Sequence, residues 1–278
     1  MTLGIVAQRG NDRAATLAAE IRESLQAEGV KVLVDRLTAE SLGIEGHHVE
    51  SLDEAILVVS IGGDGTFLFT ARSVGDTPIV GINLGEVGFL NAVAPADAVD
   101  VARSEYYQAV SGTLKPQVFP RLAARFGERA IGPALNEVVV HAPQRGRGFR
   151  IDVTIQVDGS VYTEDRTDGV MVATPTGSTA YNLSEAGPLV QPDLDGFVVN
   201  TLCGQRGMPP LVIDADATVE LDVAGSGTAF VIADGRTQHP VSRPVSVTVE
   251  RTGHPVRIAG PQLEFFEALG KLEAEPSW

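Results

Sequence analysis

The sequence contains almost no cysteine, and this absence removes several classes of protein from consideration. Cys203 is the single cysteine among 278 residues, so neither a disulfide framework nor a cysteine-based zinc cluster can form within the chain. The five histidines are scattered and contain no HExxH pattern, which leaves no obvious zinc site. No apolar run reaches transmembrane length, and the N-terminus lacks the charged-then-apolar pattern of a secretion signal. We therefore expect a cytoplasmic protein.

Positive charge is also scarce. The chain has 21 basic residues against 36 acidic ones, a net charge of −15, and its lysines are Lys31, Lys115 and Lys271. Such a surface repels nucleic acids and anionic membranes, so we expect neither as a partner. It also repels nucleotides unless a metal ion or backbone dipoles offset the charge. An acidic, lysine-poor surface fits a protein that works in concentrated salt, where self-repulsion is screened.

The first part of the chain predicts an α/β domain. Hydrophobic residues make up 44% of the sequence, enough for a sizeable core. Apolar runs at 3–7, 30–35, 54–61 and 77–83 predict strands, and the apolar spacing between residues 11 and 28 predicts a helix. The run EAILVVSI (54–61) does not alternate, which indicates a parallel strand buried on both faces. In such sheets ligands bind beyond the carboxyl ends of the strands.

After about residue 110 the pattern changes to alternation. Residues 150–163 alternate apolar and polar side chains and then turn at Asp158-Gly159, which predicts a hairpin. Further strands are predicted at 218–223, 229–235 and 244–250, with helical patterns near 179–187 and at 260–273. The predicted domains are an α/β domain with a parallel sheet at 1–110, a mostly antiparallel β domain at 111–255, and a C-terminal helix at 256–278 that packs on the first domain.

The segment SIGGDGTFLF (60–69) places three glycines and one aspartate directly after an apolar strand. Glycines ahead of a helix bring bare amide groups and the positive helix end together, which suits an anion, and a phosphate chain can lie on a backbone without Cβ atoms. Asp64 would repel a phosphate, so it indicates a second role: accepting the proton of an attacking hydroxyl, or holding Mg²⁺. The alternative is an ordinary strand-to-helix turn in which Asp64 only caps the helix.

Two more segments place polar residues at strand ends. LNEVVV (135–140) puts Asn136 and Glu137 at the head of an apolar run, where they can hydrogen-bond ribose or amine groups. TDGVMVATPTGSTAYNLSEAGPLV (167–190) runs from a strand into a stretch dense in hydroxyl groups, which suit ribose and phosphate, while Tyr181 can stack on a ring. The alternatives are a solvated strand end for the first segment and an ordinary helix cap for the second.

Taken in this order, these segments resemble the NAD kinases. The resemblance is carried by GGDGT (62–66), GINLGEVGFL (81–90), NE (136–137) and DGVMVATPTGSTAY (168–181), and it extends from the first strand to the DG at 234–235. The TPTGSTAY block is specific, whereas GGDGT is shared with lipid kinases and phosphofructokinases. The acidic composition adds a resemblance to archaeal, halophilic members.

The resemblance implies a reaction. The family transfers the γ-phosphoryl group of ATP, or of polyphosphate in some members, to the 2′-hydroxyl of the adenosine ribose of NAD, which gives NADP. It implies an active site in the cleft between two domains, Mg²⁺ carried by ATP without an assigned protein ligand, and a homodimer or homotetramer.

The resemblance also implies roles for individual residues. Asp64 would accept the proton, Asn136 and Glu137 would hold the adenosine end, and Asp168, preceded by Arg166, would meet the nicotinamide amide. Tyr181 would lie against a ring. The other residues expected to bind nucleotide or NAD are Gly63, Gly65, Thr66, Arg147, Thr179, Ala180, Asn182, Leu183, Ser184 and Arg236.

Three positions depart from the family's pattern. CGQRGMPPLVI (203–213) stands where many relatives have a segment rich in His and Ser that ends in Arg-Pro. Arg236 stands where Gln is common, so it can contact a ligand only with a different set of donors. Glu86 adds a negative charge at a variable position. The roles of all three stay open.

Two other functions remain open from the sequence alone. A lipid or sugar kinase would share the glycine loop but leaves the TPTGSTAY block unexplained, and the chain lacks a basic amphipathic segment for a membrane substrate. A non-catalytic NAD-binding sensor would keep the pocket without turnover, and the presence of Asp64 counts against it.

Overall fold

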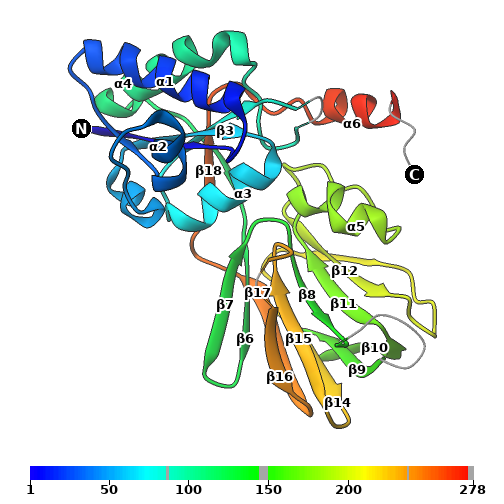
Figure 1. The fold of residues 1–278 in the computed structure, drawn as a ribbon. Helices are drawn as coiled ribbons and strands as arrows, with labels where there is room; N and C mark the ends of the chain where they lie inside the picture. Colours follow the sequence, from blue (N-terminus) through cyan, green and yellow to red (C-terminus); the bar gives the residue numbers. More distant parts are fainter. Residues whose placement is uncertain (86–87, 144–149, 237, 275–278) are drawn as a thin grey trace. The chain divides into compact units, whose positions relative to one another are not determined.

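The computed structural model describes residues 1–85, 88–143, 150–236 and 238–274 (Figure 1). The chain divides into two units, Met1–Phe119 with Pro255–Trp278, and Pro120–His254. The first unit therefore contains both ends of the chain, and the second is one continuous segment between them. The first unit extends to residue 119, beyond the boundary at 110 that the sequence suggested.

The first unit is built on one six-stranded sheet of order β2-β1-β3-β4-β18-β5. Its strands are β1 (Thr2–Ala7), β2 (Lys31–Val34), β3 (Leu57–Gly62), β4 (Ile79–Asn83), β5 (Gln117–Phe119) and β18 (Val256–Ala259). Its α-helices are α1 (Asp12–Ala27), α2 (Arg36–Leu42), α3 (Asp64–Ser73), α4 (Ala98–Ser111) and α6 (Phe265–Ala274), with 3-10 helices η1 (Val49–Glu54) and η2 (Pro95–Asp97). All strand pairs are parallel except β5 with β18.

Helices cover both faces of this sheet, which explains the unbroken apolar run in β3. Val59 and Ile61 pack in one cluster with residues of α1 and α4, among them Ile21 and Ala102. On the opposite face of β3, Ser60 accepts a hydrogen bond from Thr70 of α3 (3.3 Å). Since neighbouring residues of a strand point to opposite faces, α3 covers one face while α1 and α4 cover the other. Figure 1 shows α1 and α4 side by side.

The second unit contains two six-stranded sheets in which every pair is antiparallel. The first sheet has the order β10-β9-β14-β17-β6-β7 and consists of β6 (Leu122–Phe126), β7 (Arg129–Ala134), β9 (Ile151–Val157), β10 (Ser160–Thr167), β14 (Val219–Ala224) and β17 (Val245–Arg251). The second has the order β13-β12-β11-β8-β15-β16 and consists of β8 (Glu137–His141), β11 (Gly169–Ala173), β12 (Gly196–Leu202), β13 (Leu211–Asp214), β15 (Thr228–Ala233) and β16 (Gln238–Ser242).

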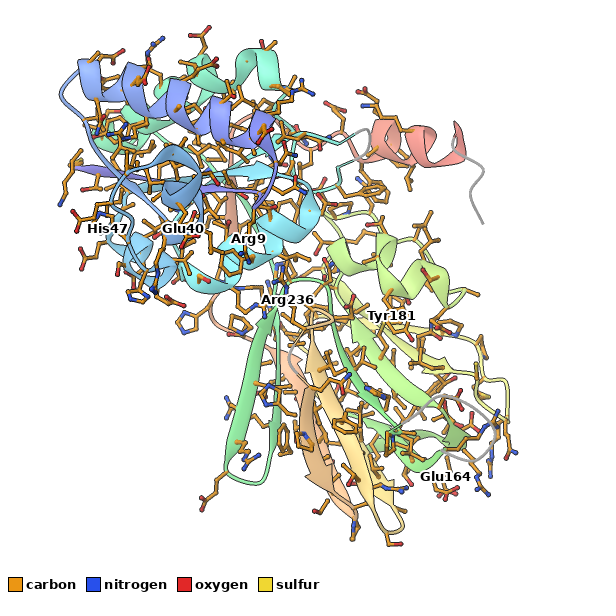
Figure 2. All side chains as sticks on the ribbon, viewed as in Figure 1. Arg9, Glu40, His47, Glu164, Tyr181 and Arg236 are labelled. Carbon is orange, nitrogen blue, oxygen red and sulfur yellow. The ribbon has the colours of Figure 1, made fainter. Side chains whose placement is uncertain are left out.

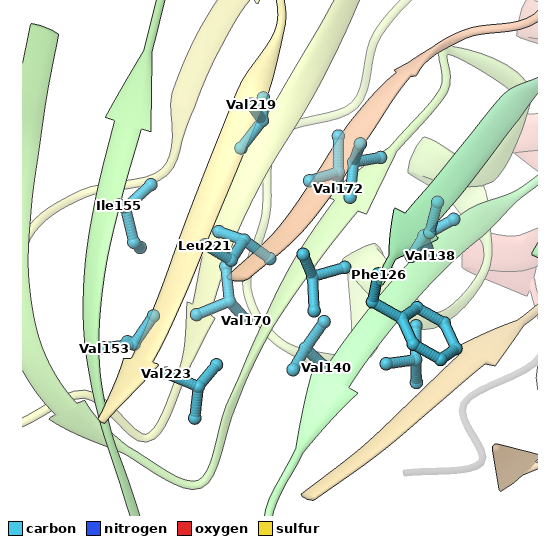
Figure 3. Packing of buried hydrophobic residues seen from close by; sticks show 14 of the residues in the cluster. Phe126, Val138, Val140, Val153, Ile155, Val170, Val172, Val219, Leu221 and Val223 are labelled. Atoms are coloured by element: carbon cyan, nitrogen blue, oxygen red, sulfur yellow. The ribbon is translucent and has the colours of Figure 1, made fainter. Parts of the chain in front are cut away.

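The two sheets pack face to face around a core of branched aliphatic side chains (Figure 3). Val153 and Leu221 enter this core from one sheet, and Val138 and Val172 from the other. The predicted hairpin turns at Asp158 and Gly159, both with positive φ (47° and 73°), as a tight two-residue turn requires. The predicted fold class, an α/β unit followed by a mostly antiparallel β unit, is confirmed by these sheets.

The other face of the second sheet is covered by a loop segment with a 3-10 helix η3 (Thr176–Thr179) and the short α5 (Tyr181–Ser184). Met171, Val198 and Val190 form a small core there, against which Tyr181 packs. β11 is therefore buried on both faces. The helix expected near 179–187 is limited to these two short pieces.

The C-terminal helix is present as α6, and the ring of Phe265 lies 6.2 Å from the ring of Phe89 in the same unit. Ahead of it, β18 completes the parallel sheet beside β4, a strand that the sequence pattern did not reveal. Among the described residues, no helix is both long enough and apolar enough to cross a membrane.

Candidate active site

The glycine loop forms the junction between β3 and α3 in the first unit. Gly63 is the N-cap of α3, and no side chain in the described part of the chain caps this helix end, whereas Asn11 and Asp35 cap α1 and α2. A Cβ built at Gly63 or Gly65 would meet no atom of the described residues within 4 Å. At Gly62 it would lie 2.5 Å from the Thr66 hydroxyl oxygen, so a side chain cannot fit there. The Cβ positions of Gly63 and Gly65 thus stay clear of the described residues, and the dipole of a helix N-terminus favours an anion.

Asp64 is the first residue of α3, but its side chain does not cap the helix. Its carboxylate accepts hydrogen bonds from the backbone amides of Phe89 (3.1 Å) and Leu90 (3.3 Å) and from the side-chain amide of Asn91 (2.9 Å). Burial raises the pKa of Asp64, and the three donors oppose that rise. The alternative of a simple helix cap is therefore wrong: Asp64 joins the glycine loop to the segment that follows β4.

In the second unit, Asn136 and Glu137 lie at the start of β8 and are held by Asp234. The Asp234 carboxylate accepts the backbone amides of Leu135 (3.0 Å), Asn136 (2.8 Å) and Glu137 (3.3 Å), and the Asp234 amide donates to the Glu137 carbonyl (3.0 Å). Asp234 adopts positive φ (49°) to reach them. One carboxylate therefore fixes the backbone of the whole NE segment.

The side chains of this segment are left for other contacts. The Asn136 side chain is half-buried and makes no hydrogen bond to the described residues. Glu137 is 4% exposed, and its Oε2 is buried without a hydrogen-bond partner among the described residues. Burial, with a smaller contribution from the nearby Asp234 charge, raises the pKa of Glu137 to about 8. A buried carboxyl group without a partner is costly unless a ligand supplies one.

The hydroxyl groups of the TPTGST turn serve the turn itself. Thr174 and Thr176 both donate to the Leu135 carbonyl, Ser178 donates to Pro175 (2.7 Å), and Thr179 donates to Thr176 (3.1 Å). These hydroxyl groups therefore donate their hydrogens within the turn and shape its backbone. The expectation that they face ribose or phosphate stays a prediction. A Cβ at Gly177 would lie 2.0 Å from the Asn136 carbonyl oxygen, so this glycine lets the turn lie against the NE segment.

The segment 179–184 presents few free polar groups. Asn182 is fully buried: its side-chain amide donates to the Pro188 carbonyl (3.0 Å), and its oxygen accepts from Asn200 (3.3 Å). Asn182 thus holds the segment rather than facing a ligand. Thr179, Ala180 and Leu183 are half-buried, and Ser184 is exposed. Figure 2 shows Tyr181 at the start of α5, where it is half-buried.

Asp168 lies between β10 and β11, and Arg166 lies near the end of β10. Asp168 is 9% exposed, and one of its carboxylate oxygens lies 3.3 Å from the Arg150 guanidinium. Arg166 is more exposed and lies 3.9 Å from Asp152.

Arg166 lines an open pocket of about 370 Å³. Asp165 forms part of its wall and binds the amides of Gln205 (3.0 Å) and Arg206 (3.1 Å), which anchors the unusual 203–213 stretch.

The remaining expected residues are Arg236, Arg147 and Glu86. Arg236 is exposed in the turn between β15 and β16, beside the Asp234 anchor in sequence (Figure 2). Arg147 and Glu86 lie outside the described residues. Among the residues that the structure describes, no cluster of three His, Cys, Asp or Glu residues is arranged to hold a metal ion.

Two family models match the chain in succession. The ATP-NAD kinase N-terminal domain matches residues 3–109, and the ATP-NAD kinase C-terminal domain matches residues 135–259. The chain belongs to the NAD kinase family. The resemblance seen in the sequence is confirmed, and the NAD kinase match decides against a lipid or sugar kinase. The chain is accordingly an ATP-dependent kinase that acts on NAD.

Curated relatives and solved structures agree with the NAD kinase assignment. The NAD kinases of Halorubrum lacusprofundi and Halobacterium salinarum, both halophilic archaea, are each 52% identical to this chain over 98% of it and 100% of their own length. The structure of an NAD kinase from Archaeoglobus fulgidus in complex with ATP has a TM-score of 0.78 and 28% identity, covering 99% of this chain and 100% of that one. Yeast NADH kinase complexed with NADH shares the fold, with a TM-score of 0.86 at 20% identity, covering 100% of this chain and 89% of that one.

Two residues near the NAD kinase motifs were not predicted as site residues. Asn91 contacts Asp64 across 27 positions of sequence, and Asp234 contacts Asn136 across 98. Asp234 carried a signal, because an aspartate followed by glycine between two strands favours a tight turn with positive φ. Nothing in the local pattern identified Asn91.

Proposed function

We propose that Asp64 accepts the proton of the 2′-hydroxyl of the adenosine ribose while the γ-phosphoryl group of ATP is transferred to that oxygen. The N-terminus of α3 is the proposed cradle for the donor phosphates, with Gly63, Gly65 and Thr66 around it. The observation that carries this proposal is the position of Asp64. Its carboxylate sits at the start of α3, where none of the described side chains caps the helix, and it is held by donors from a second loop. Positioning of this kind supplies most of the rate in phosphoryl transfer.

We assign NAD binding to the second unit. Glu137 and Asn136 are proposed to bind the adenosine end. Asp234 fixes their backbone, while Glu137 Oε2 and the Asn136 side chain have no hydrogen-bond partner among the described residues. Tyr181 is proposed to lie against a ring, and Asp168 to meet the nicotinamide amide. Thr179, Ala180, Leu183 and Ser184 line the same segment. Asn182 holds the backbone of this segment in place, since its side chain is buried and hydrogen-bonded. Roles for Arg147, Arg166 and Arg236 as ligand cations stay predictions.

Charge is the main obstacle for two anionic substrates on a protein of net charge −15. We propose that Mg²⁺ enters with ATP and offsets the triphosphate charge, together with the amides at the start of α3. No protein ligand for the metal is assigned. The cytoplasmic location and the homodimer or homotetramer stay predictions from the sequence.

The test is formation of NADP by the purified protein from NAD and Mg-ATP, with polyphosphate as donor in parallel, at low KCl and at molar KCl. NADP formed with ATP, and lost when EDTA removes Mg²⁺, is the expected result. Tight NAD binding without NADP under any donor or salt condition would favour the sensor function and would contradict the proposal. Activity with polyphosphate settles the donor preference separately.

A further inference from the structure

The segment after β4 binds the Asp64 carboxylate through three donors of two kinds. Phe89 and Leu90 use backbone amides, which every residue type except proline offers. Asn91 uses its side-chain amide, so this donor depends on the residue type. Of the three contacts, the one from Asn91 is the shortest, at 2.9 Å. The identity of residue 91 therefore matters for the carboxylate in a way that residues 89 and 90 do not.

Asn91 is held rigidly. It is 3% exposed, and its backbone lies close to β4: a Cβ at Gly81 would be 3.0 Å from the Asn91 Cα and 2.5 Å from its Oδ1. Two residues later, Val93 pairs with β4, since its amide donates to Gly81 (3.1 Å) and its carbonyl accepts from Asn83 (2.9 Å). The glycine at 81 permits this approach. Asn91 is thus fixed from the sheet side, and its amide hydrogen points at Asp64.

The hydrogen bonds are shared unequally between the two carboxylate oxygens of Asp64. Oδ1 accepts from Leu90 and Asn91, and Oδ2 accepts from Phe89. A carboxylate has about four acceptor sites, two on each oxygen. Counting donors from the described residues, both sites on Oδ1 are therefore filled and one site remains on Oδ2.

We infer that Asn91 is a positioning residue that aims the Asp64 carboxylate so that Oδ2 takes the substrate proton. The inference rests on the proposed base role of Asp64. In the step, the hydroxyl oxygen forms its bond to the γ-phosphorus while the bond from that phosphorus to the bridging oxygen of the leaving diphosphate breaks. The hydroxyl proton moves to Oδ2. The Asn91 amide stays on Oδ1 and keeps the carboxylate ionised before the step.

Few groups in the described residues affect the pKa of Asp64. Burial raises its pKa, the two backbone amides and Asn91 lower it, and no charged side chain of the described residues contributes. Replacing Asn91 with aspartate removes a donor and adds a like charge against Oδ1. Both changes raise the pKa of Asp64 further, because two adjacent carboxyl groups cannot both ionise easily.

The experiment compares kcat as a function of pH in the wild type, Asn91→Asp and Asn91→Ser, with KM for NAD and for ATP. Asn11→Asp is the matched control: it adds the same charge in the same unit and keeps an acceptor at the cap of α1. We expect Asn91→Asp to lose at least about tenfold in kcat at pH 7, while its KM values for NAD and ATP stay within about twofold of the wild-type values. The acidic limb of its curve of kcat against pH should move to higher pH by about one unit or more. In Asn91→Ser, kcat and the acidic limb should change in the same direction by less. In Asn11→Asp, the acidic limb should stay where it is in the wild type.

Wild-type kcat and an unmoved acidic limb in Asn91→Asp would overturn the inference. A loss that is equal at every pH and accompanied by raised KM values would also overturn it, since that is the signature of a merely structural role. If Asn91→Asp does not fold, the acidic limb of Asn91→Ser decides. Asp64→Asn separates this test from the proposed function: full turnover in that variant refutes the base role, whereas an inactive Asp64→Asn with a wild-type Asn91→Asp refutes the positioning role alone.

Discussion

Replacing Glu137 with glutamine should make the ligand-free protein more stable at neutral pH. Glu137 is 4% exposed, one of its carboxylate oxygens lacks a partner among the described residues, and its pKa is raised from 4.5 to about 8. Between these two pH values the folded protein keeps a proton that the unfolded chain has released. Stability contributed by this proton is complete below about pH 4.5 and declines as the pH rises toward 8. Glutamine is neutral throughout and removes this decline.

The size of the effect follows from the same shift. Each pH unit in this interval corresponds to about 1.4 kcal/mol of unfolding free energy. From pH 5 to pH 7.5 the wild type should therefore lose about 3 kcal/mol relative to Glu137→Gln. In a chain of this size that difference amounts to roughly 6–12 °C in melting temperature.

The assay is urea unfolding followed by circular dichroism at pH 5, 6, 7 and 8, at one fixed KCl concentration. The quantity of interest is the difference between variant and wild type, because the titration of every other carboxyl group cancels in it. Glu164→Gln is the control, since Glu164 is an exposed glutamate on β10 of the same unit (Figure 2). A difference that stays flat from pH 5 to pH 8, or a Glu164→Gln curve that matches Glu137→Gln, would refute the reasoning.

Three further predictions concern the NAD site and the surface. Tyr181→Ala should weaken apparent NAD affinity by roughly 10- to 100-fold with kcat retained, as loss of a stacked ring does, while Tyr181→Phe stays near wild type; unchanged affinity in a titration of Tyr181→Ala removes this residue from the site. Asp234→Asn tolerates the positive φ but loses charged acceptors for three amides, so calorimetry should show about 2 kcal/mol lower stability together with weaker NAD binding. Molar KCl should raise the melting temperature above its value in dilute buffer, because salt screens the net charge of −15; a flat or falling melting temperature speaks against salt adaptation.

The sequence predicts elements whose signals are local. The first strands and α1 follow from apolar periodicity, and the hairpin at Asp158-Gly159 from turn chemistry. β18 was not predicted, because its partner β4 lies far away in sequence and a short strand has no clear sequence pattern of its own. α4 was not predicted, because most side chains on its buried face are small. Its buried residues, Ala98, Ala102 and Tyr106, give only a weak apolar pattern.

The same distinction holds within the candidate site. Glycine loops and strand ends are typical of ligand sites, so Asp64 and Glu137 were predicted as site residues from their neighbours in sequence. The residues that hold them, Asn91 and Asp234, act through contacts between distant segments. The sequence around Asp234 predicts a tight turn but not its contact with Asn136, and nothing around Asn91 indicates a role. The hydroxyl-rich turn shows a second limit of local patterns: Thr176 and Ser178 suggested ligand contacts, yet each donates its hydroxyl hydrogen to a nearby backbone carbonyl.

The base role of Asp64 is tested most directly by single-turnover formation of NADP in the wild type and in Asp64→Asn, with NAD affinity measured on the same samples. Asparagine keeps the size of the side chain and removes the acceptor for the proton. We expect Asp64→Asn to bind NAD with wild-type affinity and to lose most of its turnover, by at least about 100-fold. Full turnover in Asp64→Asn would contradict it.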